Sequence, residues 1–198
     1  MIDEIVVIDN VIPSSMQNQI EDLFTSGRLG WIFFKDIAVS PEDIKRLNIK
    51  KLTPGIACYI KQDNPKFLNE QLYNIVKMIP EAACKHINKQ CLEIHNARSF
   101  MHFPLNDELR KEYDNVHIDV HYPHLVVLYY VNDTDGDTFI FDKTTADCKY
   151  ITKDTKLNVL KKVSPKKGRV VVFNGNRYHS SSGPTKDVRC IINFNVKI

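Results

Sequence analysis

The stretch NVHIDVHYPHLVVLYYVND, residues 115–133, places three histidines and an aspartate ahead of a long run of β-branched, aliphatic and aromatic residues. The run at 124–132 is typical of a buried strand. Successive side chains of an extended chain point to opposite faces, so His117 and Asp119 share one face and Ile118 takes the other. An imidazole and a carboxylate therefore converge, and the stretch is a candidate metal site.

His117 and Asp119 supply two thirds of a two-histidine, one-carboxylate facial triad, the arrangement expected of non-haem Fe(II) oxygenases. The third ligand has to come from another part of the chain. His179 is a candidate because it follows the strand-like run 169–173 and the turn at 174–176, ahead of a Ser/Gly/Pro loop. A histidine at such a junction is free to point into a pocket.

Other histidines offer alternatives. His121 has the same strand parity as His117 and Asp119, so an H-x-D-x-H zinc site is one reading. Same-face positions lie roughly 6.5 to 7 Å apart, which is too wide for three of them to close easily on one ion, and this favours His121 as a residue of the pocket or its mouth. His124 is a candidate for the shell around the ligands, with an ordinary polar residue at a strand end as the alternative. Ordinary polar roles are expected for His86, His95 and His102.

Composition favours one folded domain, residues 1–198. The chain is 43% hydrophobic and 26% charged, which is enough apolar material for one substantial core. Its formal net charge of +3, from 27 basic and 24 acidic residues, does not suggest a dedicated nucleic-acid binder. A basic cluster comprises Lys161, Lys162, Lys166, Lys167 and Arg169. Because no aromatic residue interleaves these charges, a solvated loop rim is favoured over a nucleic-acid or acidic-partner patch.

The five cysteines are odd in number and never in a C-x-x-C spacing. Neither a disulfide framework nor a thiolate zinc site is favoured, and reduced thiols are expected. The first residues carry acids where a signal peptide would carry Lys or Arg, and no apolar run approaches the roughly 18 to 20 residues of a membrane span. The sequence therefore predicts a cytoplasmic protein with no membrane partner.

The first part of the chain, about residues 1–90, contains the helix signals. The run 4–9 predicts a short strand, and Pro13-Ser14-Ser15 starts an amphipathic helix that Gly27 is placed to end. Three further elements are expected: a strand at 31–38, a short helix at 40–51, and a helix with one apolar face at 65–79.

From about residue 91 to 198 the pattern changes to short apolar runs separated by turn residues. Strands are predicted at 91–103, 115–120, 124–132, 137–142, 148–152, 157–163, 169–175 and 188–198. This spacing is typical of a β-sandwich or barrel. Helices first and strands later indicate an α+β, mainly β domain whose N-terminal helices pack outside the sheet.

Two arginines lie in strand-like runs. Arg189 is surrounded by apolar residues, so its guanidinium demands a carboxylate or an equivalent partner. Arg98 shares a strand face with Asn96, and both are candidate co-substrate or substrate contacts, with surface exposure as the alternative. Asn193 shares the face of Arg189 and is a weaker candidate. The polar stretch that contains Tyr113 and Asp114 is either a loop over the site or a plain connection.

These parts resemble, in order and spacing, the 2-oxoglutarate and Fe(II)-dependent dioxygenases, and within them the prolyl 4-hydroxylase-like branch. The residues that carry the resemblance are His117-x-Asp119, the strand 128–132, the turn and strand 135–139, the segment 165–173, His179 and Arg189. The match runs from about residue 98 to the C-terminus. Asp135-Gly136-Asp137 departs from the paired glycines common in the family, and Ile191 replaces a serine that some members carry.

The resemblance implies a double-stranded β-helix core, also called a jelly roll and cupin-like. It implies that His117, Asp119 and His179 bind Fe(II), and that Arg189 and Tyr130 contact the far carboxylate of 2-oxoglutarate. Asn96, Arg98 and His124 are further candidate contacts for the co-substrate.

The reaction that the resemblance implies hydroxylates a C–H bond and converts 2-oxoglutarate and O2 to succinate and CO2, with ascorbate as a candidate reductant. The favoured prime substrate is peptidyl proline or another amino-acid residue, in a protein, a peptide or a small molecule. Two alternatives stay open: a non-catalytic jelly-roll protein that binds a metal or ligand, and a nucleic-acid-modifying oxygenase of the same superfamily.

Overall fold

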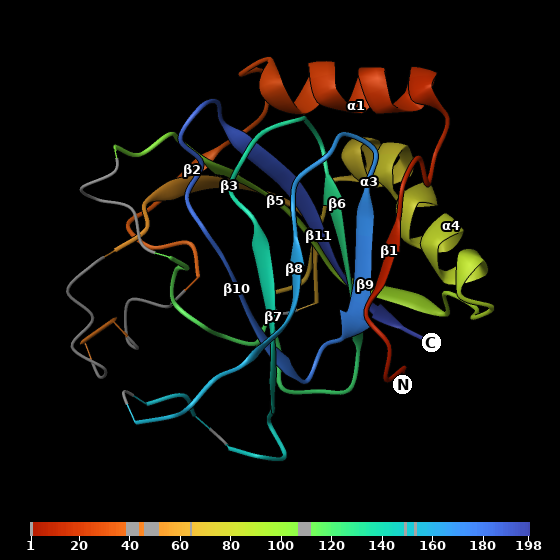
Figure 1. The fold of residues 1–198 in the computed structure, drawn as a ribbon. Coiled ribbons are helices and arrows are strands. Elements are labelled where there is room, and N and C mark those ends of the chain that lie inside the picture. The colour runs from red at the N-terminus through yellow and green to blue at the C-terminus, as the bar shows by residue number, and fades with distance from the viewer. Residues whose placement is uncertain are drawn as a thin grey trace.

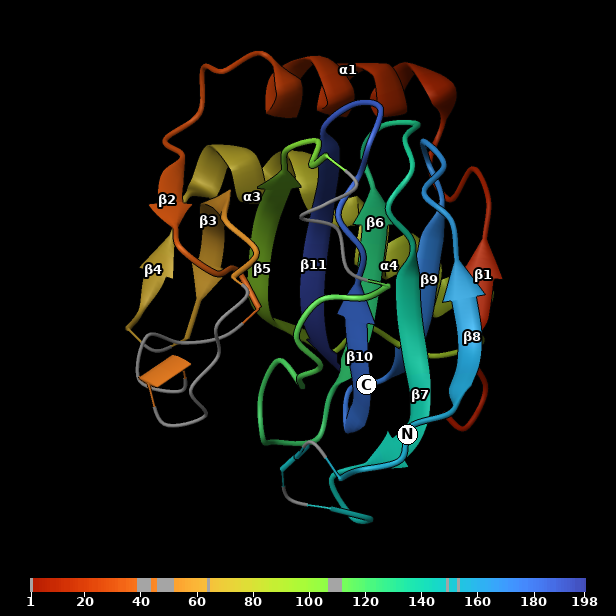
Figure 2. The ribbon, with the colours of Figure 1, turned by 60° about the vertical axis from the view of Figure 1, so that its left-hand side comes forward.

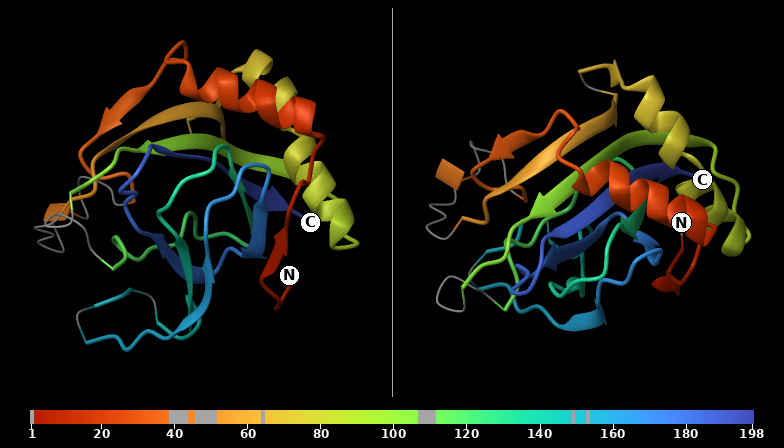
Figure 3. Two further views of the ribbon diagram at one scale, coloured as in Figure 1. Left: turned by 45° about the horizontal axis from the view of Figure 1, so that its top comes forward. Right: turned by 90° about the horizontal axis from the view of Figure 1, so that it is seen from above.

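The computed structural model describes residues 2–38, 44–45, 52–63, 65–106, 112–148, 150–152 and 154–198. Two antiparallel sheets lie face to face, a larger one of eight strands and a smaller one of three. The helices cover the outer face of the larger sheet (Figures 1 and 3). The expected α+β, mainly β fold with a jelly-roll core and helices outside the sheet is therefore confirmed.

The larger sheet has the order β1-β9-β6-β11-β5-β3-β2, with β4 also paired to β3. Its strands are β1 (Val6–Ile8), β2 (Ile32–Phe34), β3 (Gly55–Gln62), β4 (Phe67–Leu68), β5 (Glu93–His102), β6 (Leu125–Tyr130), β9 (Val170–Asn174) and β11 (Arg189–Lys197). The smaller sheet has the order β10-β7-β8, formed by β7 (Thr138–Thr144), β8 (Val159–Val163) and β10 (Arg177–Ser181).

Strand β6 explains why its sequence is apolar without alternation. Val127 and Tyr129 belong to the core under the helices, while Val126, Leu128 and Tyr130 belong to the core between the two sheets. A strand buried on both faces needs apolar side chains at every position. Each such side chain contributes roughly 1.5 to 3 kcal/mol by leaving water, so β6 anchors both layers.

Helix α1 (Ser14–Thr25) lies across the top of the larger sheet in Figure 1 and buries Ile20 and Phe24 completely. These residues are four positions apart and so lie on one helix face. Gly27 follows with a φ of +70°, a conformation that glycine adopts without strain, and the predicted helix end is confirmed.

The predicted helix at 65–79 is wrong in its extent. Phe67 and Leu68 form β4, and two helices follow, α3 (Glu70–Val76) and α4 (Met78–His86). Asn69 separates the strand from the helices because its side chain accepts a hydrogen bond from the Leu72 backbone N–H at 3.1 Å. Asparagine at this capping position starts a helix, which outweighs the apolar periodicity around residue 67.

Other boundaries also differ. Strand β3 was missed because its segment mixes glycine, alanine and lysine with apolar residues, and β10 was missed because it was taken for a loop. The predicted strand at 115–120 is reduced to a single antiparallel bridge between His117 and His179. The described residues of 148–152 form no strand. Of the predicted helix at 40–51, only residues 44–45 are described.

Within the described residues, no helix has the length and apolar character to cross a membrane.

Candidate metal centre and adjoining cavity

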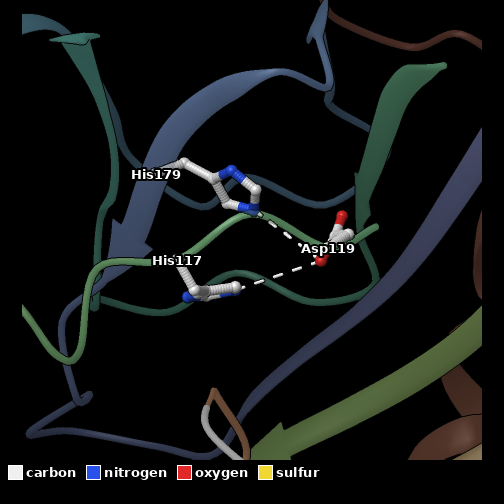
Figure 4. A group of neighbouring side chains, drawn as sticks. All are labelled: His117, Asp119 and His179. Atoms are coloured by element: carbon white, nitrogen blue, oxygen red, sulfur yellow. Dashed lines mark ion pairs between the residues drawn. The ribbon is translucent and has the colours of Figure 1, made fainter. Parts of the chain in front are cut away.

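Three side chains from two segments meet between the two sheets: His117 and Asp119 from the segment before β6, and His179 from β10. The Nε2 atom of His117 lies 4.0 Å from Oδ1 of Asp119, and the Nε2 atom of His179 lies 3.8 Å from the same oxygen. The candidate ligand atoms all lie within 4.8 Å of one another (Figure 4). The sequence-derived candidates are therefore brought together as one group, in a donor set suited to Fe(II).

Backbone pairing positions the two imidazoles. His117 and His179 exchange two backbone hydrogen bonds of 3.0 Å, so the segment before β6 is attached to β10. The Nδ1–H of His117 donates to the Asn115 carbonyl at 2.9 Å, and the Nδ1–H of His179 donates to the Arg177 carbonyl at 3.1 Å. These bonds leave both Nε2 lone pairs free to face Asp119, the tautomer that a metal requires.

Two amides hold the carboxylate of Asp119. Asn193 and Asn195, alternate residues of β11, donate from Nδ2 to Oδ2 of Asp119 at 2.8 and 3.0 Å. Because Oδ2 is occupied, Oδ1 is the oxygen presented to the histidines. From the sequence, Asn193 was only a weak candidate and Asn195 was not identified. The signal it could have used is the N-x-N spacing, which places both amides on one strand face.

The electrostatics of the group favour a bound cation. Burial and the neighbouring His179 lower the pKa of His117 to about 4, so this imidazole is neutral. Burial alone would raise the pKa of Asp119, but its contacts with His179, Arg98 and His117 outweigh burial and hold it well below the usual range. Burial lowers the pKa of His179, and the nearby charge of Asp119 more than reverses this. The carboxylate is thus charged, and the amides of Asn193 and Asn195 donate hydrogen bonds to it.

The described part of the chain contains one more cluster of this kind, formed by Asp63, Glu93 and His95. Asp63 and Glu93 are exposed, and Lys61 Nζ lies 3.4 Å from Oδ1 of Asp63. A cation at this surface would compete with the lysine. This cluster is therefore a weaker candidate, and the ordinary polar role expected of His95 stays a prediction.

A cavity of about 120 Å³ extends from the metal cluster along the space between the sheets. One water needs roughly 10 to 15 Å³ on this scale, so the cavity accommodates a molecule of about ten non-hydrogen atoms, the size of 2-oxoglutarate. Phe100, Leu128 and Ile191 give it apolar walls. Its polar ends are formed by different residues, the cluster at one end and Arg189 at the other.

Arg189 is buried at that second end, with 2% of its surface exposed. Its Nε donates to the Gly136 carbonyl at 2.7 Å and its Nη2 donates to Oγ1 of Thr138 at 2.9 Å. No carboxylate of the described residues forms an ion pair with it. Gly136 permits this approach, since its φ is +96° and a Cβ there would lie 3.0 Å from Cδ of Arg189. A buried cation without a counter-ion indicates an anionic ligand.

Tyr130 is close to Arg189 but does not line the cavity. Its hydroxyl donates to Oγ1 of Thr138 at 2.7 Å, and its ring lies 5.8 Å from Cζ of Arg189. Burial raises the pKa of Tyr130 to about 12, so the phenol remains a donor. Thr138 lines the cavity and Tyr130 contacts it from behind, so the direct contact expected of Tyr130 stays a prediction. Thr138 was not identified from the sequence, because only the pairing of the strands places it beside the cavity.

His102 is a second residue that sequence reasoning missed. It pairs with Arg189 across β5 and β11, lines the cavity, and is 4% exposed. Its Nδ1 is buried without a hydrogen-bond partner among the described residues. Burial and the positive charge of Arg189 lower its pKa well below the usual value, so the ring is neutral. Its strand parity with Arg98 was the available signal.

The remaining candidates divide between the cavity and its surroundings. Arg98 lines the cavity, with Nη2 3.8 Å from Oδ1 of Asp119. Asn96 does not line the cavity, and its amide donates to the Tyr122 hydroxyl at 2.8 Å. His124 is buried against Gly175, and its Nδ1–H donates to the Tyr122 carbonyl at 2.8 Å.

His121 is exposed and does not line the cavity. It is also not a member of the candidate ligand group. Asp114 does line it and accepts hydrogen bonds from Thr53 at 2.8 Å and Ser181 at 3.3 Å. Tyr113 packs its ring against Phe139 and Phe141 instead.

The basic cluster is largely used within the fold. Lys166 and Arg169 form ion pairs with Asp9, Lys167 with Glu21, and Lys162 with Asp137. The pairs with Asp9 and Glu21 link the end of β1 and the helix α1 to the loop before β9. The solvated loop rim favoured from the sequence stays a prediction.

No protein-family model matches the sequence, and no curated protein matches it either. Solved structures match over nearly the whole chain. A 2OG-Fe(II) oxygenase family oxidoreductase from Burkholderia pseudomallei gives a TM-score of 0.65 at 12% identity, covering 98% of this chain and 84% of that one. A prolyl hydroxylase from Trichoplax adhaerens, in complex with a hypoxia inducible factor peptide, gives 0.57 at 15% identity, covering 97% and 82%.

The epimerase SnoN of nogalamycin biosynthesis, described as non-heme and alpha ketoglutarate dependent, gives a TM-score of 0.62 at 10% identity, covering 97% of this chain and 77% of that one. The chain therefore has the fold of 2OG-Fe(II) oxygenases, prolyl hydroxylases among them. The resemblance seen in the sequence is confirmed at the level of the fold.

Proposed function

We propose that the protein is an Fe(II)- and 2-oxoglutarate-dependent dioxygenase that hydroxylates a C–H bond. The observation that carries the proposal is a single cavity with two different ends. Two imidazoles and a carboxylate converge at one end, and at the other lies a buried guanidinium that forms no ion pair with the described residues. A metal chelated by a dicarboxylate satisfies both ends at once.

In this proposal His117, Asp119 and His179 hold the metal. They fit it chemically, because both Nε2 atoms and Oδ1 are presented to one point while Asn193 and Asn195 hold the other carboxylate oxygen. When bound, Fe(II) together with 2-oxoglutarate and O2 supplies the oxidising chemistry, and 2-oxoglutarate is converted to succinate and CO2. The protein contributes geometry and an apolar cavity wall.

The far carboxylate of 2-oxoglutarate is proposed to bind Arg189, Thr138 and His102. Arg189 offers charge-assisted hydrogen bonds, and Thr138 offers its own O–H, since its oxygen already accepts from Tyr130 and Arg189. A neutral imidazole at His102 donates one N–H. Tyr130 supports this end through Thr138.

The prime substrate is proposed to be a prolyl or other amino-acid residue, or a small molecule of similar chemistry. Support comes from the peptide-bound prolyl hydroxylase of the same fold, while SnoN shows that the fold also carries other reactions. A cytoplasmic location is part of the proposal, and its support is the set of five free cysteines.

The proposal is tested by incubating anaerobically prepared protein with Fe(II), 2-oxoglutarate and ascorbate, then admitting O2 and measuring succinate. We expect succinate to form slowly even without a prime substrate. The parent should form it faster than the His179→Ala variant. Equal succinate from both proteins would refute it. A protein that binds the metal and ligand without turnover would show the visible charge-transfer band of the chelate and keep it after exposure to O2.

A further inference from the structure

Two polar side chains stand beside the metal cluster with unused hydrogen-bonding groups. Arg98 of β5 and Asn193 of β11 are paired residues of neighbouring strands, and both line the cavity. They lie at the metal end, whereas Arg189 lies four residues away from Asn193 along β11, at the opposite, closed end of the cavity, where it pairs with His102 and both are buried. They therefore form a polar site separate from the one proposed for the far carboxylate.

Arg98 has a guanidinium whose donors are free. Its side chain is 24% exposed, and it forms no hydrogen bond with a described residue. Its ion pair with Oδ1 of Asp119 is long, at 3.8 Å, and that oxygen is the one presented to the metal. Its Cζ lies 5.3 Å from the centre of the Phe100 ring, which supports the flat face of the group. Such a guanidinium is suited to a carboxylate.

Asn193 has a buried acceptor without a partner. The residue is 6% exposed, and its Nδ2 is committed to Asp119. Its Oδ1 has no hydrogen-bond partner among the described residues. A buried carbonyl oxygen left in this state destabilises the free protein, so a ligand that brings an N–H or O–H is favoured.

The co-substrate does not satisfy this pair. At neutral pH 2-oxoglutarate has carboxylate and ketone oxygens but no N–H or O–H, so it has nothing to donate to Oδ1 of Asn193. The acceptor therefore points to a second molecule, the one whose C–H bond is to be brought to the metal.

We propose that Arg98 and Asn193 bind the prime substrate through a carboxylate and an adjacent O–H or N–H. The substrate class is an α-hydroxy or α-amino acid, free or at the C-terminal end of a chain. The main chain of a residue inside a peptide has no carboxylate, so an internal prolyl residue matches the pair less well. This inference rests on the proposed function, because it concerns the substrate of the same metal site.

The test uses protein loaded with Mn(II), which is redox-inert here and paramagnetic, and with saturating 2-oxoglutarate. The probes are L-lactate, which has a carboxylate beside a hydroxyl, and L-lactamide, which lacks the charge. Titrations that follow the paramagnetic relaxation of the methyl protons give each Kd. We expect lactate to bind about tenfold more tightly than lactamide, the effect of a charge-assisted hydrogen bond.

Variants assign the effect to a residue. Arg98→Gln should bring the Kd of lactate to that of lactamide, and Arg98→Lys should retain part of the difference. Lys61→Gln removes one charge from the neighbouring strand β3 without touching the cavity lining and should behave as the parent. Raising 2-oxoglutarate tenfold should leave the lactate signal unchanged, which shows that the probe does not occupy the co-substrate site.

The outcomes separate the two proposals. Binding of Mn(II) and 2-oxoglutarate is measured first, and a parent protein that binds neither overturns the proposed function and this inference together. If both bind but lactate and lactamide behave alike, the inference alone is overturned. The same holds if Arg98→Gln weakens 2-oxoglutarate and leaves lactate unchanged, since Arg98 then serves the co-substrate.

Discussion

The two ends of the cavity are held in place in different ways. At the metal end, His117 lies outside any strand and reaches its place through one backbone bridge to His179. At the closed end, Arg189 and His102 lie opposite each other on paired strands of the larger sheet. The metal end therefore depends on the docking of separate segments, while the closed end depends on the register of one sheet. Perturbations at the two ends should have different signatures.

The largest effect is expected at the metal end. His179→Ala removes one ligand, and we expect metal affinity and succinate formation to fall by more than about 100-fold, since even residues behind the ligands are worth 10- to 100-fold. Metal titration and a succinate assay measure both. His121→Ala is the matched control, because His121 is exposed and outside the ligand group. An equal loss in the control would contradict the assignment.

The closed end should respond in the opposite sense for binding and stability. Arg189→Met removes a buried cation that forms no ion pair within the described part of the chain, so the free energy of unfolding of the ligand-free protein should stay level or rise. The affinity for 2-oxoglutarate should fall by about 30-fold or more, because a buried charge pair is lost in the complex. Denaturant unfolding and an anaerobic titration of 2-oxoglutarate check this. A less stable protein with unchanged affinity would reverse the assignment.

Asn195→Ala tests the support behind the metal ligands. Asn195 donates to Oδ2 of Asp119 but does not line the cavity. We expect metal affinity to fall by about 10-fold, towards the low end of such effects, because Asn193 still holds the same oxygen. The affinity for 2-oxoglutarate at saturating metal should change little. Parental metal affinity in this variant would show that the amide has no role.

His102→Phe keeps the ring volume and removes the N–H. We expect the affinity for 2-oxoglutarate to fall by about 5- to 10-fold, the value of one hydrogen bond to a charged group. Metal affinity should be unchanged, which distinguishes this residue from those at the metal end. His86→Phe, on α4 and remote from the cavity, is the control for a general effect of the substitution. A loss of metal affinity instead would contradict the assignment of His102 to the end of the cavity that contains Arg189.

The smallest effect is expected far from both ends. Arg169 donates to Asp9 from Nε at 2.7 Å, and Lys166 donates to the same carboxylate at 3.0 Å. Together these two cations lower the pKa of Asp9 to about 2. A depressed carboxyl pKa stabilises the fold above the unfolded value near 3.8, and the stabilisation is lost as the pH falls towards 2. Because Asp9 is partly exposed, Asp9→Asn should cost less than about 1 kcal/mol at pH 7. Urea unfolding at pH 7 and pH 3 should show a smaller difference at the lower pH, and ligand affinities should not change.

The sequence was sufficient for residues whose role follows from strand parity or from an unusual residue type. His117 and Asp119 could be paired because they are two positions apart, and Arg189 was notable because a guanidinium in an apolar run needs a partner. Thr138 and His102 escaped because their roles depend on which strands are neighbours, which local periodicity does not specify. Tyr130 was placed on the correct strand, but the hydroxyl of Thr138 lies between it and the cavity.

The same distinction explains the errors in the fold. Helix α1 was predicted well because its start, apolar face and end are all local signals. Strand β3 was missed because glycine, alanine and lysine give it a weak local preference, and it is held instead by pairing with β5 and β2. Strand β10 was missed because its polar residues resemble a loop, although its pairing with β7 fixes His179.

The bridge between His117 and His179 links metal content to the integrity of the fold. Their backbones already join the segment before β6 to the smaller sheet, and a cation held by both side chains would close a second ring across the same two residues. By mass action, a metal present at about 100 times its Kd adds roughly 2.7 kcal/mol to the free energy of unfolding. Without metal, local unfolding should therefore begin at the bridge between His117 and His179. The supply of metal would then determine the lifetime of the folded protein as well as its activity.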